Sequence, residues 1–485
     1  MLGTAFLCLS WAPLWHTDLW VHLKYGQWIW TNWRVPRTEL FMPLAEGVRY
    51  QDDAWLSQLI FYGGFTAARF EGLSLLYAST VVTLLAFLLA AGHRATGRLW
   101  LAVVTLVVLT PCLLPHLVTI RPTLFGALLF VAILYIVLAR TWHVSNWVLI
   151  PLLFVAWVNL HSSFLLGLAV LACCALGHTV EAWHQRKRFG SVLGHHDAVR
   201  WFLVFELALV ACLVNPYGLG LLQAISTMAR SPNLRYLVDW GPLSVQSWTG
   251  IAFVASIVIL VWLLRVSKRP VRGSEGLLLL AFGIASLSYT GSTIWWWLLI
   301  PFLYLPHIGE ILDQRWPCHI YTAVRDFKNT MIAVALAWIL VACSGPGRAM
   351  IHHDPRKLEK VLSRLTPLET SEYVREHRPI GQIFNPVDWG DWLVWYGPTD
   401  LKCLVSSQVD LVPEEIWRAY QRVYQGEDNW ERTLQSLGIR TIIIDKERQK
   451  ELLNVVRLSA NWKIVHEDKL GVVAERARPE PIPHS

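Results

Sequence analysis

The sequence predicts a mainly α-helical polytopic membrane protein with about eleven transmembrane helices and a C-terminal soluble α/β domain. Three observations support this fold class. Hydrophobic residues make up 54% of the 485 residues and charged residues only 16%, and the mean hydropathy is +0.40. Apolar runs of spanning length recur through residues 1–345, whereas residues 346–485 are rich in charge. This composition argues against a soluble globular protein.

Each predicted span is an apolar run with polar residues at both ends. The runs lie at residues 1–15, 73–92, 99–116, 122–140, 146–161, 163–183, 201–220, 249–265, 275–291, 294–312 and 329–344. The first run is short, because its residues reach about 22 Å as a helix against a hydrocarbon core of about 30 Å. It has no charged n-region and no clear small-residue cleavage site. We therefore expect an anchor helix and not a signal peptide.

The loop charges predict which side of the membrane each loop faces. A cytoplasmic N-terminus assigns these basic residues to inner loops: Arg94, Arg98, Arg140, Arg186, Lys187, Arg188, Arg200, Arg265, Lys268, Arg269, Arg272, Arg315, Arg325 and Lys328. The short outer loops then hold only Arg121, Arg230 and Arg235. The positive-inside rule favours this threading, which places residues 16–70 and the C-terminal domain outside the cytoplasm. The net charge of +7 therefore indicates topology and not a nucleic-acid partner.

The cysteines suggest neither a metal site nor a redox site. Six of the eight lie in or beside apolar segments: Cys8, Cys112, Cys173, Cys174, Cys212 and Cys343. The sequence has no CxxC pair and no metal-ligand spacing, so we interpret these cysteines as small apolar side chains.

The outer segment that follows the first run contains most of the candidate chemistry. Residues 16–30 are predicted to form a helix along the membrane surface, with tryptophans at positions 15, 20, 28, 30 and 33 in an interfacial belt. Asp18, His22 and Tyr25 share one face of this helix. Pro36-Arg37-Thr38-Glu39 predicts a turn, and Asp52 or Asp53 is a plausible N-cap of a further helix. Carboxylates from separate helices thus approach one membrane face.

Residues 346–485 predict a small α/β domain. The strand-like runs 401–405, 441–444 and a final pair near 462–473 alternate with helical stretches near 369–376 and 414–424. A short amphipathic helix is expected within 355–365. No Gly-rich phosphate loop or nucleotide fingerprint occurs there.

At these residues the chain resembles bacterial multi-span glycosyltransferases of the GT-C type, the class that includes protein O-mannosyltransferases and aminoarabinose transferases. The resemblance covers most of the chain. It is carried by Asp18 with Trp20 and His22, by Pro36-Arg37-Thr38-Glu39, and by Asp52 with Trp55-Leu56-Ser57-Gln58. Later elements are Arg121-Pro122-Thr123-Leu124-Phe125, Asn159-Leu160-His161-Ser162-Ser163-Phe164, Asn215-Pro216-Tyr217-Gly218 and Asp388-Trp389-Gly390-Asp391-Trp392-Leu393.

The resemblance implies transfer of a sugar from a polyprenyl-phosphate donor to an extracytoplasmic acceptor at a bacterial inner membrane. The partners would be membrane lipid, the donor lipid and a glycan, lipid or protein acceptor. Because the donor already has a good leaving group, the enzyme must mainly deprotonate an acceptor hydroxyl or amine. Asp18 is the first candidate for this general base, with Asp52 and Asp53 as further catalytic candidates.

The remaining candidates are assigned to substrate binding. Arg121, His161 and Lys24 are candidates to stabilise the charge of the departing phosphate, and His22, Arg37 and Glu39 belong to the same motifs. No metal ligands are predicted. Some members of the class use a divalent metal and others do not, so the sequence leaves the need for one open.

The chain departs from the family pattern most clearly at Asp53-Ala54, where many relatives have His-Glu. This departure keeps open a second interpretation, a catalytically inactive membrane scaffold whose outer domain binds a partner. A third interpretation, a transporter or flippase for a lipid-linked substrate, would favour ionisable residues near mid-membrane and discontinuous helices in paired halves. At the residue level, Asp18, Asp52 and Asp53 are also suited to helix capping.

Overall fold

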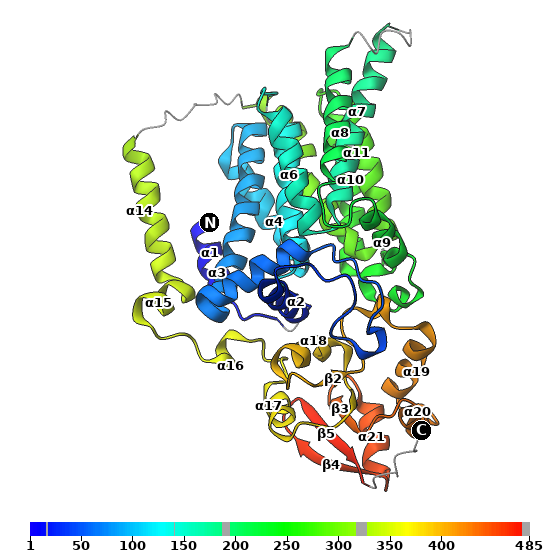
Figure 1. Ribbon diagram of the computed structural model, residues 1–485. Coiled ribbons are helices and arrows are strands. Elements are labelled where there is room, and N and C mark those ends of the chain that lie inside the picture. The colour runs from blue at the N-terminus through cyan, green and yellow to red at the C-terminus, as the bar shows by residue number, and fades with distance from the viewer. Residues whose placement is uncertain (16–17, 140, 187–194, 317–326, 478–485) are drawn as a thin grey trace. The chain divides into compact units, whose positions relative to one another are not determined.

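The computed structural model describes residues 1–15, 18–139, 141–186, 195–316 and 327–477 (Figure 1). The chain divides into two compact units. Unit 1 comprises residues 1–12, 67–221 and 235–355, and unit 2 comprises residues 13–66, 222–234 and 356–485. The sequence-based division places residues 16–70 with the membrane part, whereas the structure groups residues 13–66 with the C-terminal part. Arg140, Lys187, Arg188 and Arg325 of the predicted inner loops lie outside the described residues.

Unit 1 consists of helices. Its elements are α1 (Leu2–Trp11), most of α3 (Trp55–Thr96), α4 (Leu99–Leu117), α5 (Pro122–Leu134) with a π-helical extension (Tyr135–Ala139), α6 (Asn146–Leu160), α7 (Phe164–Arg186), α8 (His196–Ala211), α10 (Trp248–Val266), α11 (Gly273–Ser288), α12 (Thr293–Leu303), α13 (Leu305–Asp313), α14 (Phe327–Cys343) and α15 (Gly345–His352). In the described ranges, six helices are long and apolar enough to cross a membrane, or seven if the bent pair α14 and α15 is one span. The chain is therefore a polytopic helical protein, and the predicted number of eleven spans stays a prediction.

Two predicted spans are shorter in the structure because of proline. The run at 1–15 is helical only to Trp11, where Pro13 disfavours helical backbone at the preceding Ala12. The run at 201–220 is helical only to Ala211, and Pro216 interrupts the remainder. In α3 the helix breaks at Ala68 and Arg69, and Arg69 has a φ of 53°. This break falls close to the boundary between the two units.

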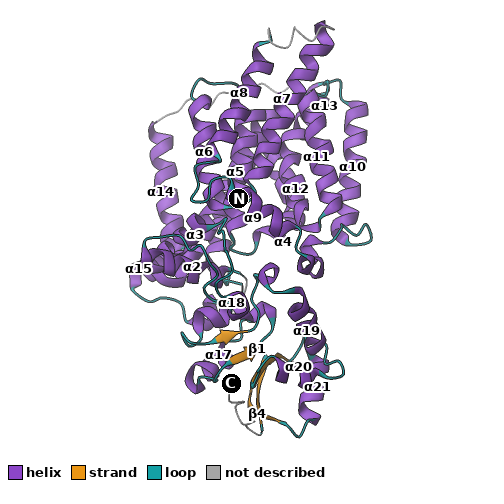
Figure 2. Cartoon of the chain, turned by 45° about the vertical axis from the view of Figure 1, so that its right-hand side comes forward, coloured by secondary structure: helices purple, strands orange, loops and turns teal. Residues whose placement is uncertain are grey.

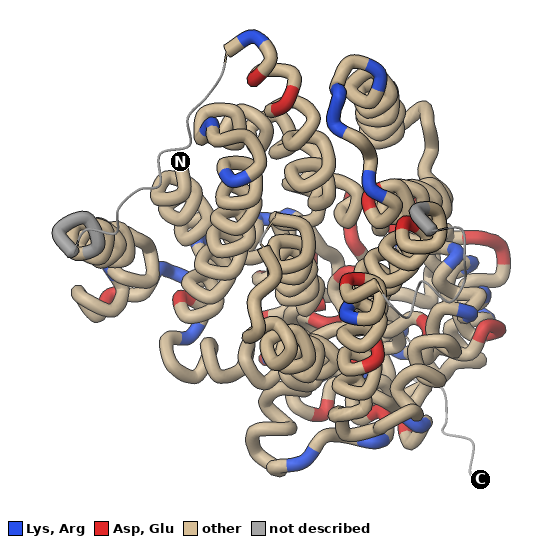
Figure 3. The backbone as a smooth tube through the Cα atoms, turned by 90° about the horizontal axis from the view of Figure 1, so that it is seen from above, with Lys and Arg blue, Asp and Glu red and all other residues tan. Residues whose placement is uncertain are grey.

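Basic residues of separate predicted inner loops form ion pairs within unit 1, and Figure 3 colours every described Lys and Arg blue. Arg98 lies 2.6 Å from Asp313, and Arg269 lies 2.6 Å from Glu275. The backbone N–H of Gly273 donates a hydrogen bond to Glu181 of α7. Loops that are far apart in sequence therefore meet at one end of the bundle, as loops on one side of a membrane must.

Unit 2 combines short helices with a mixed sheet (Figure 2). Its helices are α2 (Leu19–Asn32), the start of α3, most of α9 (Gly220–Ala229), α16 (Leu358–Val361), α17 (Leu368–His377), α18 (Val387–Tyr396), α19 (Glu414–Tyr424), α20 (Trp430–Ser436) and α21 (Lys450–Leu458). The strands are β1 (Gln382–Phe384), β2 (Lys402–Cys403), β3 (Thr441–Asp445), β4 (Trp462–Glu467) and β5 (Gly471–Arg476). The amphipathic helix expected within 355–365 is present only as the single turn α16.

The sheet has the strand order β2-β1-β3-β5-β4. β1 pairs in parallel with β2 and β3, whereas β5 pairs antiparallel with β3 and β4. The core beneath it includes Ile383, Ile443 and Val473 from three strands, with Trp389 from α18 packed among them. The predicted alternation of strands and helices is therefore present.

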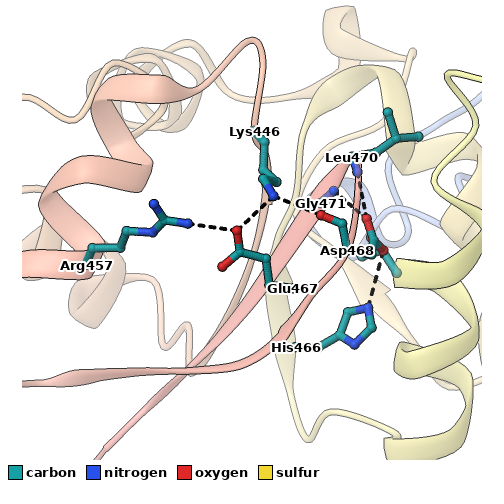
Figure 4. Close-up of polar contacts among 8 residues, drawn as sticks. Lys446, Arg457, His466, Glu467, Asp468, Leu470 and Gly471 are labelled. Atoms are coloured by element: carbon teal, nitrogen blue, oxygen red, sulfur yellow. Dashed lines mark hydrogen bonds and ion pairs between the residues drawn. The ribbon is translucent and has the colours of Figure 1, made fainter.

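The β4–β5 hairpin is closed by one aspartate (Figure 4). The Asp468 carboxylate accepts hydrogen bonds from the backbone N–H groups of Leu470 and Gly471 at 2.8 and 2.7 Å. Lys446 donates to the Asp468 carbonyl and pairs with Glu467. These contacts fix the turn at the edge of the sheet.

Helix α2 is buried in unit 2 and packs against α18. Trp20 is fully buried, and its ring lies 4.8 Å from that of Trp392 in an edge-on arrangement. The prediction that Trp20 belongs to an interfacial belt is therefore wrong, because the ring has a partner on α18. Trp30 and Trp33 are 48% and 88% exposed, as side chains in such a belt would be.

Candidate functional site

A cavity of about 410 Å³ lies within unit 2 and is lined by residues from four chain segments. Asp18, Val21 and His22 come from the start of α2, and Asp53 comes from the turn before α3. The complete described lining is Asp18, Val21, His22, Arg49, Tyr50, Gln51, Asp53, Gln223, Ala224, Ile225, Thr227, Met228, Ser407, Gln408, Asp410 and Leu411. The structure thus brings together three of the predicted site residues, Asp18, His22 and Asp53.

A chain of polar contacts links Asp18 to Asp52. His22 Nε2 lies 3.9 Å from Asp18 Oδ2. Gln58 Nε2 lies 3.2 Å from His22 Nδ1 and donates a hydrogen bond of 3.0 Å to Asp52 Oδ1. Because an amide nitrogen only donates, His22 Nδ1 accepts, and the proton of the neutral ring is assigned to Nε2, on the side of Asp18.

The close approach of α2 to the start of α3 depends on a glycine. A Cβ atom at Gly26 would lie 2.2 Å from the Gln58 carbonyl oxygen and 2.9 Å from the Tyr62 Cβ. Only a residue without a side chain fits this position. Gly26 therefore allows α2, which carries Asp18 and His22, to pack against the helix that carries Gln58.

Asp52 is buried beside the cavity and is not among the residues that line it. Its side chain is 1% exposed and accepts hydrogen bonds from Gln58 and from the backbone N–H of Ala54. Burial, together with smaller contributions from the nearby Asp53 and Glu39 carboxylates, raises the pKa of Asp52 to about 8. At neutral pH this group is therefore mainly the uncharged acid.

Glu39 is buried, and its side chain is used in hydrogen bonds that hold the surrounding loop. It is 2% exposed and accepts hydrogen bonds from the Tyr25 hydroxyl and from the backbone N–H groups of Phe41 and Met42. The turn predicted at Pro36–Glu39 is not formed as such: the chain only bends at Arg37, Thr38 pairs with Arg49 in an antiparallel bridge, and the Glu39 N–H donates to the Val48 carbonyl at 2.9 Å. Glu39 thus shapes the loop whose end contributes lining residues.

The segment after β2 forms the cavity wall supplied by the C-terminal part of the chain. It contains the single 3₁₀ turn η7 (Val409–Leu411). Burial raises the pKa of Asp410 to about 6, and the charges of Asp53 and Glu39 contribute in the same direction. Asp410 is therefore mainly a carboxylate at neutral pH.

The other predicted substrate-binding residues are not lining residues of this cavity. Arg37 is exposed, and its carbonyl accepts a hydrogen bond from the Tyr50 N–H. Lys24 is partly buried on α2, and burial lowers its pKa.

Arg121 and His161 belong to unit 1. Arg121 precedes α5, and no side-chain capping hydrogen bond is formed there. His161 follows α6, and its ring contacts Thr123 Oγ1 at 3.3 Å and accepts a hydrogen bond from the Ser163 N–H at 3.1 Å. His161 thereby links the first turn of α5, the end of α6 and the residue that precedes α7.

Sequence reasoning assigned no role to several cavity residues, namely Arg49, Tyr50, Gln51, Gln223, Thr227, Ser407, Gln408 and Asp410. Tyr50 and Gln51 adjoin the motif that begins at Asp52, so extending that motif would have found them. Asp410 lies far along the chain in a segment without a motif, and no signal in the sequence marks it. Among the described residues, no group of three or more His, Cys, Asp or Glu side chains is arranged to hold a metal ion.

Comparisons with known proteins find a similarity of fold. No family model matches the chain, and no curated protein matches it. The fold is similar to a cryo-EM structure of a mutant of the mycobacterial arabinofuranosyltransferase AftD, with a TM-score of 0.52 and 15% sequence identity. The match covers 98% of this chain and 41% of that one. The chain thus shares the fold of part of a glycosyltransferase, and it spans less than half of that protein's length.

Proposed function

We propose that this protein is a GT-C type membrane glycosyltransferase that moves a sugar from a polyprenyl-phosphate donor to an acceptor outside the cytoplasm. The observation that carries the proposal is the meeting of Asp18 and Asp53 in one cavity. The similarity of the fold to AftD supports the same class. The motifs that resemble this class also supply lining residues of the cavity, namely Asp18, His22 and Asp53.

In the proposed reaction, Asp18 accepts the proton of an acceptor hydroxyl. The hydroxyl oxygen then bonds to the anomeric carbon of the donor sugar, and the bond from that carbon to the phosphate oxygen breaks. The polyprenyl phosphate leaves with the bonding electron pair. Asp18 suits the role of base because its side chain is 26% exposed and lines the cavity.

The neighbouring residues support Asp18 in this proposal. His22 holds its Nε2 proton on the Asp18 side, and Gln58 fixes the ring by donating to Nδ1. Asp52 acts through Gln58 as a positioning residue, since it is buried and mainly uncharged at neutral pH. Asp53, from another segment of the lining, is proposed to contact substrate.

The remaining assignments follow from charge. Arg121, His161 and Lys24 each remain a candidate, by residue type alone, to stabilise the departing phosphate. Arg37 and Glu39 support substrate binding through the loop that Glu39 shapes. The protein would reside in a bacterial inner membrane, with unit 2 outside the cytoplasm in contact with the donor lipid.

The test is sugar transfer by the purified full-length protein in lipid nanodiscs. The donors are radiolabelled polyprenyl-phosphate sugars that include arabinofuranose. We expect Asp18→Asn to lower turnover by about 10²-fold or more, as the loss of a general base does. Asp52→Asn should have a smaller effect, because an amide oxygen can still accept both hydrogen bonds.

Asp400→Asn is the matched control, because Asp400 is exposed in the C-terminal part. Equal turnover in the parent and Asp18→Asn would refute the assigned base. No transfer by the parent from any donor would favour the inactive scaffold, whose basis is the buried Ala54 at the position where many relatives have Glu.

A further inference from the structure

The wall that the C-terminal part contributes to the cavity is held by three anchors. Asn233 Nδ2 donates hydrogen bonds of 2.8 Å to the carbonyl oxygens of both Val409 and Val412. These two carbonyls flank Asp410 in the chain. Asn233 is 1% exposed, so it forms these bonds away from water, where their loss is costly.

The other two anchors fix the start of the wall. Gln408 Nε2 donates to the Tyr50 hydroxyl at 3.0 Å, and the Ser407 N–H donates to Asp391 Oδ1 at 3.1 Å. Asp391 is 3% exposed. A turn held on both sides by buried groups presents Asp410 in a fixed position, as a preorganised binding site requires.

The charges of the lining select against anions. Asp18, Asp53 and Asp410 contribute carboxylates, whereas Arg49 is the one permanently cationic side chain among the described lining residues. A phosphate or carboxylate group in this cavity would be repelled by the surplus of negative charge. The cavity is therefore better suited to the acceptor than to the donor's phosphate.

The rest of the lining suits a polyhydroxylated ligand. Gln223 and Gln408 carry amides, and an amide both donates and accepts hydrogen bonds. Ile225 and Met228 supply an apolar side. A sugar presents hydroxyl groups at its rim and C–H groups on its faces, so it matches a lining that combines carboxylates and amides with apolar side chains.

We propose that this cavity binds an uncharged sugar, with the Asp410 carboxylate accepting hydrogen bonds from its hydroxyl groups. The assignment of that sugar as the acceptor rests on the proposed function. Sugar binding itself does not, and it can be measured without turnover.

The experiment is a saturation-transfer NMR titration of the full chain in nanodiscs. The probes are methyl arabinofuranoside and methyl glucoside, which are neutral, and methyl glucuronide, which is anionic. We expect the neutral glycosides to bind the parent, and the glucuronide to bind at least tenfold more weakly. Asp410→Asn should weaken binding of the neutral probes about tenfold, because a hydrogen bond to a charged acceptor is lost.

Asn233→Asp keeps the size of the side chain but removes both donors to the turn, and should weaken binding to a similar degree. Asp400→Asn should bind as the parent does. Failure of the neutral probes to bind the parent, equal binding by Asp410→Asn, or equal affinity for the glucuronide would each overturn the inference. If the parent protein binds the neutral sugars but transfers none, the inference of a sugar site holds and the proposed glycosyltransferase activity is wrong.

Discussion

Asp52 and Asp53 are adjacent in sequence, but they differ in burial and therefore in chemistry. Asp53 lines the cavity, whereas Asp52 is 1% exposed and points to Gln58 and the Ala54 N–H. Their chemistry differs accordingly, because burial raises the pKa of Asp52 to about 8. A carboxyl that holds its proton at neutral pH is suited to fixing a hydrogen-bond chain rather than to removing a proton.

The raised pKa of Asp52 predicts a pH-dependent cost to stability. In the unfolded chain Asp52 has its ordinary pKa of 3.8, whereas in the folded protein its pKa is about 8. The folded state binds more protons between these values, so the contribution of this group to stability falls as the pH rises from about 4 to about 8.

Asp52→Asn removes this titration and keeps the acceptor oxygen. We expect the thermal midpoint of the variant to exceed that of the parent by more at pH 9 than at pH 5. Thermal unfolding in nanodiscs at both pH values measures this, with Asp400→Asn as the control. A difference that does not change with pH would contradict the assigned pKa.

At the scale of elements, the site depends on how closely α2 packs against α3. The i, i+4 spacing of Asp18 and His22 on α2 is a property of the helix, but the contact of His22 with Gln58 exists only because Gly26 lets the helices meet. Glycine in a helix interior usually costs about 0.5–1 kcal/mol relative to alanine. Here the close approach outweighs that cost.

Gly26→Ala should therefore destabilise the protein despite alanine's better helix propensity. A Cβ atom 2.2 Å from the Gln58 carbonyl forces the helices apart, and overpacking of this kind costs about 1–3 kcal/mol. We expect a lower thermal midpoint and reduced transfer. Gly63→Ala on α3 is the matched control, because nothing lies within 4 Å of its added Cβ, and it should leave stability unchanged or raise it. Equal midpoints for the two variants would show that the close approach does not matter.

At the scale of the whole molecule, the chain separates into a helical unit and a unit that combines the outer segment with the C-terminal part. Predicted inner-loop residues such as Arg98 and Arg269 lie in contacts at one end of unit 1. The positive-inside rule assigns that end to the cytoplasm. From the loop charges of the sequence, the same rule predicts that residues 16–70 and the C-terminal part, which make up most of unit 2, lie outside the cytoplasm.

Alkaline phosphatase fusions test this sidedness, because that enzyme is active only outside the cytoplasm. We expect activity for fusions after Arg476 and after Glu46, and none for fusions after Lys268. A cytosolic protein such as green fluorescent protein, fused at the same positions, should give the opposite pattern. Activity at Lys268 would overturn the topology, and with it access of the donor lipid to Asp18 as proposed.

The sequence alone determined the helical membrane class, the position of most helices and the presence of a strand-containing C-terminal part. These features depend on composition and periodicity, which are local and do not require knowledge of the packing. The predicted helix at 414–424 matches α19 (Glu414–Tyr424) for this reason. Ends of helices were less predictable where proline acts, as at Pro13 and Pro216.

Only the tertiary structure decided which side chains share the cavity. Asp18, Asp53 and Asp410 are separated by long stretches of chain, and burial, which sets the pKa of Asp52, depends on residues from several segments. Local patterns carry no record of such distant contacts. Trp20 illustrates this limit, because its sequence neighbours suggest a membrane surface while its partner Trp392 places it in a protein core.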